Sequence, residues 1–386
     1  MYLKDRPSRR RRKRSSLPIL LIALALLIGV GYIANQEYDL LRNPFQTPTP
    51  APTPTRSTLS ILDEVSDLQD QGKVSEAADV LALVAEREPD NDEVWRDMAR
   101  LLVYASRYDE AVTAARKAVE INGDDARNQA ALASALDWNG DYDESYTLAQ
   151  LAVQMDPALA DAHATLAEVL ADLGSWRQAV QEAEAALELD PRNFNAVRVL
   201  GYAYEVQGKY TEALDYYEQA AALEPNLPFI YLIMGRNYRA LENFDEAIAM
   251  FRRGLTGAPD DPWLRFELGK TLRLTGDEEL GLRELRKAVE LKPDMPEAYK
   301  ELAIGLYLRR AYEEAIENMT KAIDLGNEAG INFYIIGRSY LNIEAVDCEN
   351  AVPWLQRALL TDADNIPAAD AETSIRECGG EVPTRQ

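Results

Sequence analysis

Side chains of the kinds that carry out catalysis are scarce in this sequence. It has one histidine, His163, and two cysteines, Cys348 and Cys378. A serine or cysteine nucleophile needs a base beside it, and a structural zinc site takes four ligands, usually of these two residue types. No glycine-rich phosphate loop follows a strand. We therefore expect no enzyme activity, no metal and no cofactor, and we expect His163 to be a packing or surface residue.

The elements that would position any binding residues form a repeat. Residues 201–225 read as two amphipathic helices, with a break at Gly208 and an end at Pro225. The pattern recurs at a step of 34 residues. The small residues of the first helices are Val65, Ala99, Ala133, Ala167, Gly201, Gly235, Gly269 and Ala303. Those of the second helices are Ala77, Ala111, Ser145, Ala179, Ala213, Ala247, Gly281 and Ala315. An aromatic residue follows most turns, as Tyr108, Tyr142, Trp176, Tyr210, Phe244 and Tyr312. We expect the small residues to let the two helices approach and the ring to fill the wedge beside them.

This period and pattern resemble the tetratricopeptide repeat, a helix-turn-helix unit of 34 residues. The resemblance covers roughly residues 58–360. It implies an all-α fold, a right-handed superhelical α-solenoid of about nine repeats, numbered here as units one to nine. A segment from Ala368 to Cys378 reads as a capping helix, so the array is assigned to residues 58–362 and the cap and tail to residues 363–386. In unit seven, Glu278 replaces the ring and Gly281 replaces alanine, which predicts a looser turn.

The N-terminal region has the pattern of a membrane anchor. Residues 1–16 are a basic tail, and residues 17–34 contain no charged side chain. At about 1.5 Å per residue, a helix over the second stretch reaches roughly 27 Å, close to the thickness of a bilayer core. We expect one transmembrane signal anchor with the tail in the cytoplasm and the rest of the chain outside it. A cleaved signal peptide is the alternative, although Tyr32 disrupts the small-residue cleavage site that would end at Ala34. Residues 35–57 form a Pro/Thr-rich linker.

The two cysteines lie at the C-terminal end, Cys348 in a lengthened turn of unit nine and Cys378 at the end of the cap. Outside the cytoplasm a pair of thiols tends to oxidise. A bond between them would clamp the cap to the last unit and close a loop of about 30 residues. Two free thiols are the alternative.

In tetratricopeptide proteins the first helices line a concave groove that commonly holds a partner segment, and the resemblance carries this expectation to three slots in each unit here. In units five to nine these slots hold seven cations and one acid. The predicted groove residues are Arg198, Tyr202, Arg236, Arg239, Phe266, Lys270, Arg273, Lys300, Tyr307, Tyr334 and Arg338. Arg and Lys would take carboxylates and the rings would hold apolar stems, so we expect an acidic peptide as the partner. The alternative is that these cations pair with nearby Asp and Glu and keep the face soluble.

The formal net charge of −24 argues against nucleic acid as a partner. The sequence thus predicts a non-enzymatic scaffold anchored in the cell membrane, with an extracytoplasmic array that binds a protein. A structural role is the alternative, either self-association in an envelope complex or service as an accessory subunit of a secretion or polysaccharide system.

Overall fold

The computed structural model describes residues 28, 30 and 56–384. The chain divides into two compact parts, Met1–Arg56 and Ser57–Gln386. The predicted tail, membrane span and linker (residues 1–57) therefore lie outside the described residues, except for Ile28, Val30, Arg56 and Ser57. Ile28 and Val30 are helical and exposed. Within the described stretches, no helix has both the length and the apolar content that crossing a membrane requires.

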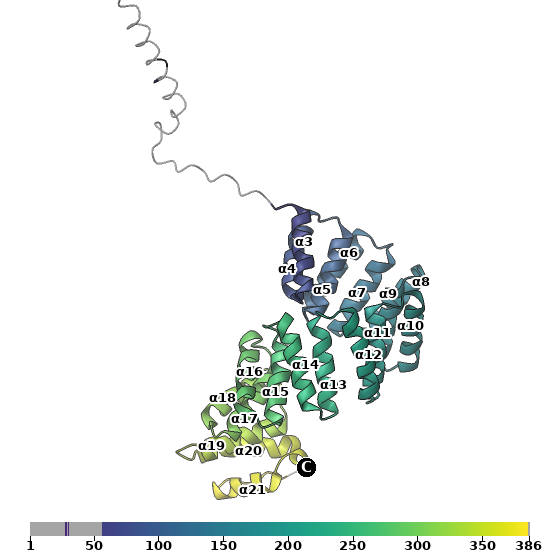
Figure 1. Ribbon diagram of the computed structural model, residues 1–386. Coiled ribbons are helices and arrows are strands. Elements are labelled where there is room, and N and C mark those ends of the chain that lie inside the picture. The colour runs from purple at the N-terminus through teal and green to yellow at the C-terminus, as the bar shows by residue number, and fades with distance from the viewer. Residues whose placement is uncertain (1–27, 29, 31–55, 385–386) are drawn as a thin grey trace, which may run out of the picture. The chain divides into compact units, whose positions relative to one another are not determined.

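The part Ser57–Gln386 contains 19 α-helices and, in the residues that are described, no strand (Figure 1). Consecutive helices pair into the nine predicted units, which confirms an all-helical solenoid. The first helices are α3 (Thr58–Asp70), α5 (Asp92–Tyr104), α7 (Ala126–Asn139), α9 (Ala160–Asp172), α11 (Phe194–Glu205), α13 (Pro228–Ala240), α15 (Pro262–Leu274), α17 (Pro296–Leu308) and α19 (Gly330–Asn342). The second helices are α4 (Val74–Arg87), α6 (Tyr108–Ile121), α8 (Tyr142–Met155), α10 (Trp176–Leu189), α12 (Tyr210–Leu223), α14 (Phe244–Gly257), α16 (Glu278–Leu291), α18 (Tyr312–Asp324) and α20 (Cys348–Asp362).

The small residues sit where the two helices of a unit touch, as the sequence predicts. In unit five, a Cβ built on Gly201 would lie 2.6 Å from the ring of Tyr217, which is completely buried. Units two to four carry alanine in both places, as in Ala99 with Ala115. A glycine on the first helix thus makes room for a ring on the second helix, where the earlier units have two alanines.

The aromatic residues after the turns are only partly covered, and four of them, Tyr108, Tyr210, Phe244 and Tyr312, are half-buried. Each is the first residue of a second helix, and Tyr142 and Trp176 remain 42% exposed. Two rings of second helices, Tyr217 and Phe251, are completely buried, and they lie one helical turn further along than Ala213 and Ala247.

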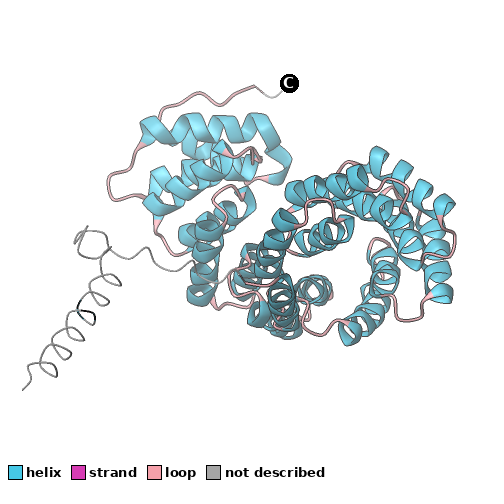
Figure 2. Cartoon of the chain, turned by 90° about the horizontal axis from the view of Figure 1, so that it is seen from above, coloured by secondary structure: helices cyan, strands magenta, loops and turns pink. Residues whose placement is uncertain are grey.

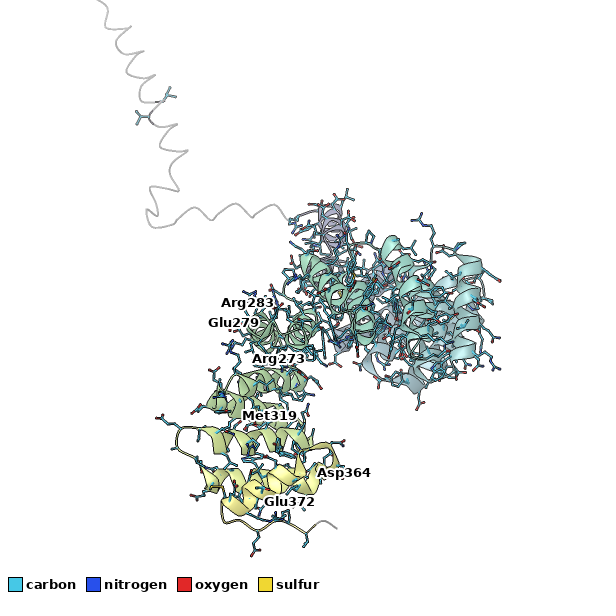
Figure 3. All side chains as sticks on the ribbon, turned by 60° about the horizontal axis from the view of Figure 1, so that its bottom comes forward. Arg273, Glu279, Arg283, Met319, Asp364 and Glu372 are labelled. Carbon is cyan, nitrogen blue, oxygen red and sulfur yellow. A yellow bond between two sulfur atoms is a disulfide. The ribbon has the colours of Figure 1, made fainter. Side chains whose placement is uncertain are left out.

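The helices of unit seven pack closely against each other at Gly269 and Gly281, and the looser turn expected between them stays a prediction. A Cβ on Gly269 or on Gly281 would lie 2.8 Å from the carbonyl oxygen of the other glycine. The side chain of Arg273 fills the adjoining space, because a Cβ on Gly281 would be 2.6 Å from its Cγ and one on Gly305 would be 2.7 Å from its Nε. Arg273 therefore lies where α15, α16 and α17 meet (Figure 3).

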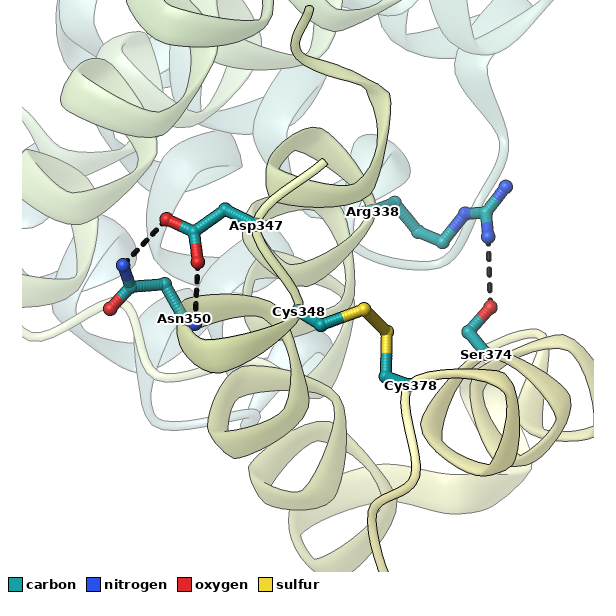
Figure 4. The surroundings of a disulfide bond; sticks show 6 residues. All are labelled: Arg338, Asp347, Cys348, Asn350, Ser374 and Cys378. Atoms are coloured by element: carbon teal, nitrogen blue, oxygen red, sulfur yellow. Dashed lines mark hydrogen bonds between the residues drawn. A yellow bond between two sulfur atoms is a disulfide. The ribbon is translucent and has the colours of Figure 1, made fainter. Parts of the chain in front are cut away.

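The C-terminal end is closed by a short 3₁₀ helix, η1 (Ala363–Asn365), and by α21 (Ala368–Glu377). A disulfide joins Cys348 to Cys378, with a Cα–Cα distance of 5.4 Å (Figure 4). Cys348 is the first residue of α20 rather than part of the preceding turn. The side chain of Asp347 caps this helix by accepting a hydrogen bond from the backbone N–H of Asn350 at 3.0 Å.

Units one and six touch each other, although more than a hundred residues separate them. A Cβ on Gly72, in the turn between α3 and α4, would overlap the carbonyl oxygen of Asn226 and lie 3.1 Å from the Cα of Gly257. Seen from above, the helices of units one to six are arranged in a closed circle (Figure 2). We call units one to six the closed turn and units seven to nine with α21 the C-terminal segment.

Four rings gather on the inner side of the closed turn. Phe229 stacks on Tyr104 with ring centroids 6.2 Å apart and meets Trp138 edge-on at 5.2 Å. Phe194 meets Tyr104 edge-on at 6.1 Å. The Tyr104 hydroxyl also donates a hydrogen bond to Asn195 at 3.2 Å, which joins units two and five. The protein's own side chains therefore fill much of the inner space of the closed turn.

Candidate interaction surface

All eleven predicted groove residues lie on first helices, namely α11, α13, α15, α17 and α19. The first helices of successive units lie next to each other, so a side chain on one helix reaches the next. Most of the predicted cations use this reach to pair with carboxylates of a neighbouring unit. The inner face is therefore closer to neutral than the sequence suggested.

On α11, Arg198 and Tyr202 both contact α9. Arg198 lies 2.6 Å from Glu168, and both side chains are almost completely buried. Burial raises the pKa of Glu168, and the Arg198 guanidinium opposes this shift. The Tyr202 hydroxyl donates to Asp172, and burial together with this bond raises the pKa of Tyr202.

On α13, Arg236 and Arg239 share one carboxylate of α15. Nε of Arg236 donates to Glu267 at 2.7 Å, and Arg239 donates to the other oxygen of the same group. Burial acts to raise the pKa of Glu267, but the two guanidinium groups outweigh it and hold the pKa below its usual range. Glu267 is therefore ionised and fully engaged at neutral pH.

On α15 and α17, two further cations meet one carboxylate. Nη1 of Arg273 donates to Glu301 at 2.8 Å, and its Nε lies 3.4 Å from Glu278. Nζ of Lys300 lies 3.9 Å from Glu301. The Arg273 side chain is only 9% exposed, so it supports the packing of unit seven and offers little to a partner.

On α19, Tyr334 and Arg338 both reach the cap. The Tyr334 hydroxyl donates to Asp370 at 2.8 Å, and Arg338 donates to Ser374 at 2.9 Å (Figure 4). Nε of Arg338 is 3.4 Å from Asp370. These contacts, together with the disulfide, tie α21 to unit nine.

Lys270 differs from the other six cations. Its Nζ lies 5.8 Å from the centre of the Phe266 ring, and no described carboxylate lies within ion-pair distance of it. Phe266 is itself buried beneath this contact. Lys270 is half-buried on the inner face and can accept an anionic group without giving up a partner.

The inner face of the C-terminal segment is partly apolar. Ile304, Tyr307 and Leu341 are half-buried there, and Tyr307 meets the ring of Tyr312 edge-on at 5.8 Å. Leu274 and Leu308 occupy the same place at the ends of α15 and α17 and are 58% and 60% exposed. These two exposed leucines add apolar surface at the ends of successive first helices.

Sequence reasoning missed the carboxylates that neutralise the predicted groove. Glu267 and Glu301 lie two residues before the small residues Gly269 and Ala303. This place is one residue away from a slot counted as concave. A search for acids about 28 to 31 residues from each cation, on the neighbouring first helix, would have found them.

Two adjoining cavities open on the inner side of the closed turn. One has a volume of about 190 Å³ and is lined by residues of units two to five, Arg100 and Tyr104 among them. The other has a volume of about 260 Å³ and extends to unit six. Trp138, Glu168 and Arg198 line both, so the Arg198–Glu168 pair stands between them. Of the eleven predicted groove residues, Arg198, Tyr202 and Arg236 line these cavities, and the other eight lie elsewhere on the inner face.

His163 has a structural position. Its ring nitrogens contact Glu182 at 2.7 Å and the Pro157 carbonyl oxygen at 3.1 Å. Trp95 and Tyr231, at the same place in other units, donate to the carbonyls of Pro89 and Pro225. His163 therefore continues a repeated contact between a first helix and the loop before it. In the described residues no group of three or more His, Cys, Asp or Glu side chains could hold a metal ion.

Comparison with known proteins agrees with this architecture. Family models described as tetratricopeptide repeat match residues 164–228 in one case and residues 68–136 and 206–265 in another. The crystal structure of the APC/C hetero-tetramer Cut9-Hcn1 is similar with a TM-score of 0.65 and 18% identity, over 88% of this chain and 66% of that one. Pseudomonas aeruginosa pilF is similar with a TM-score of 0.50 and 19% identity, over 57% of this chain and 98% of that one. No curated protein sequence matches the chain.

At these identities the two structures establish similarity of fold alone, and the chain spans less than two thirds of the length of the first. The family matches, the 34-residue step and the paired helices agree with one another. Arrays of this kind serve as scaffolds for protein interaction. The chain therefore contains tetratricopeptide repeats, which the family models match over residues 68–136 and 164–265.

Proposed function

We propose that this protein is a membrane-anchored scaffold whose array lies outside the cytoplasm and captures a segment of another protein on the inner face of units seven to nine. One observation carries the choice of this region. Lys270 has no carboxylate partner among the described residues, and it lies on the same face as the half-buried side chains of Ile304, Tyr307 and Leu341.

The partner segment we propose is apolar along most of its contact and acidic at one point. Its carboxylate pairs with Lys270, and its apolar side chains pack on Tyr307 and on the exposed Leu274 and Leu308. The remaining cations contribute less to binding, because Arg236, Arg239 and Arg273 already hold carboxylates of this chain. A fully acidic peptide would have to compete with Glu267 and Glu301.

Two observations support the proposed location. The uncharged stretch of residues 17–34 follows a basic tail, as in signal anchors. The disulfide between Cys348 and Cys378 is typical of proteins in an oxidising compartment. Membrane fractionation followed by protease treatment from the outside tests this placement. An array that remains protected in intact cells and in spheroplasts or right-side-out vesicles would contradict it.

The experiment for the binding role compares three full-length baits in pull-downs from solubilised membranes. These are the native chain, Lys270→Glu and Lys287→Glu. Lys287 is an exposed lysine of α16 in the same unit and serves as a charge-matched control. We expect a protein that binds in a salt-sensitive way to be captured by the native and Lys287→Glu baits and lost with Lys270→Glu.

Equal capture by all three baits would exclude Lys270 from the binding surface. If no protein is captured and the chain instead polymerises as its concentration rises, the structural alternative, self-association in an envelope complex, would replace this proposal. Sedimentation of the purified chain over a concentration series distinguishes these two results.

A further inference from the structure

The 260 Å³ cavity of the closed turn has a floor of buried carboxyl groups. Asp137 of α7 is only 3% exposed, and its Oδ1 has no hydrogen-bond partner in the described structure. Glu168 and Asp172 of α9 line the same cavity. Burial raises the pKa of Asp137 to about 10, and the charges of Glu168 and Asp172 and a hydrogen bond between the Asp137 and Asp172 carboxyl groups add to this shift. A buried carboxyl oxygen without a donor is an unmet requirement for a hydrogen bond.

The cations that line the cavity do not meet this requirement. Arg198 is committed to Glu168 at 2.6 Å, and Arg236 is committed to Glu267 outside the cavity at 2.7 Å. A further acid, Glu205 of α11, accepts hydrogen bonds from Tyr217 at 2.5 Å and from Asn237 at 2.9 Å, so it brings one more negative charge without a cation. The cavity therefore has an excess of negative charge.

Aromatic rings form the walls. Trp138, Tyr142, Tyr202 and Phe229 line the cavity, and two of them, Trp138 and Phe229, already face the Arg198 guanidinium at 5.5 and 5.8 Å. The mouth is open to solvent, because Tyr142 is 42% exposed and Asp172 is exposed as well. A cavity with carboxyl groups at its floor and ring faces along its walls is suited to an organic cation.

We propose that this cavity binds the guanidinium or ammonium group of a basic side chain, with N–H groups donating to Asp137 and Asp172. The site is distinct from the proposed binding face of units seven to nine and has the opposite charge preference. On binding, Asp137 gives its proton to solvent, and the incoming cation takes the place of that proton. Binding therefore strengthens as pH rises.

The test uses the full-length chain and small probes, n-propylguanidinium and n-butylammonium, with butyrate as a probe of opposite charge. Calorimetry in two buffers of different ionisation enthalpy measures both affinity and proton release. We expect saturable binding of a cationic probe, none of butyrate, and release of up to one proton per site at pH 7. The dissociation constant of n-propylguanidinium, which stays charged, should fall by up to about tenfold per pH unit between pH 6 and 9.

Variants locate the site. Asp137→Asn keeps the shape of the side chain and should weaken binding about tenfold or more and abolish proton release. Asp172→Asn, at the exposed mouth, should weaken binding while leaving the fold intact, and Asp109→Asn on α6 is the matched exposed control. A capped pentapeptide with one central arginine distinguishes a protein side chain, which it mimics, from a free small cation. Absence of saturable binding by both cationic probes, or equal binding by native chain and Asp137→Asn, would overturn the proposal.

Discussion

The closed turn and the C-terminal segment are built from the same repeat, yet they differ in how their ends are stabilised and in what their inner faces carry. The closed turn joins its own ends through Gly72, Asn226 and Gly257 and fills its inner side with rings and buried charges. The C-terminal segment has no such lateral contact in the described residues, and its inner face keeps exposed leucines and an uncommitted lysine. A disulfide and a capping helix secure its end.

The difference shows where each region obtains its stability. In a solenoid each unit contacts mainly its neighbours, so an end unit loses half of its contacts. In the closed turn, the contact between units one and six makes up for the contacts that the first unit lacks. In the C-terminal segment, the disulfide between Cys348 and Cys378 does so. Because the disulfide stabilises the end of the C-terminal segment, the inner face of this segment needs no contacts within the chain and remains available to a partner.

The largest effect should follow loss of the disulfide. Replacing Cys348 and Cys378 by serine removes a loop closure of 30 residues, which is worth about 3 to 4 kcal/mol in the chain-entropy model. Hydrogen exchange should show the loss in α20 and α21 and not in α3 to α14. Faster exchange spread evenly over the array would mean that the two regions unfold together.

A smaller loss of unfolding free energy should follow replacement of Arg273, and a much smaller one should follow replacement of Lys270. Arg273→Ala leaves Glu278 without its partner, leaves Glu301 with Lys300 alone and opens space beside Gly281 and Gly305, so it should cost about 3 kcal/mol. Lys270→Ala should cost about 0.5 kcal/mol, because it removes one contact with a ring. Urea unfolding of the two variants measures both values, and equal costs would show that Lys270 is also structural.

In the closed turn, Asp137→Asn should stabilise the protein. The pKa of Asp137 is raised to about 10 in the folded chain, so the group is neutral there and ionised when unfolded at pH 7. Unfolding therefore releases a proton, and stability from this group falls as pH rises from about 4 toward 10. The amide does not titrate, so we expect a gain of about 2 kcal/mol at pH 7 and almost none at pH 4. Thermal unfolding at both pH values checks this, and a gain independent of pH would point to a cause other than ionisation.

The smallest effect concerns the lateral contact. Gly72 and Gly208 have nearly equal φ angles of 76° and 74°, and a Cβ on Gly208 would meet no atom within 4 Å. Alanine at either position carries the same backbone strain, of about 1 to 2 kcal/mol. Gly72→Ala should cost about 1 kcal/mol more, because its methyl group overlaps Asn226. Identical unfolding free energies of the two variants would show that units one and six are not held together.

Much of this fold could be predicted from local pattern, because the 34-residue step fixes which residues face a neighbouring helix. The contact of small residues such as Gly269 and Gly281 follows from that step, although the start of α20 at Cys348 does not. The contact of Gly72 with Asn226 does not follow, because it depends on how far each unit rotates, which no local residue records. The site was harder to predict for the same reason. Whether Arg236 is free depends on Glu267 of the next unit, and the reach between two first helices is a property of their packing.

The lateral contact between units one and six also has a mechanical consequence. A superhelix whose units touch only in sequence behaves as a spring, and tension on its ends opens it without breaking any single strong contact. In this protein the contact at Gly72 bridges a full turn, so extension of the closed turn must first separate α3 and α4 from α13 and α14. Under load, we therefore expect units seven to nine, the region in which we place the partner, to extend before the closed turn does.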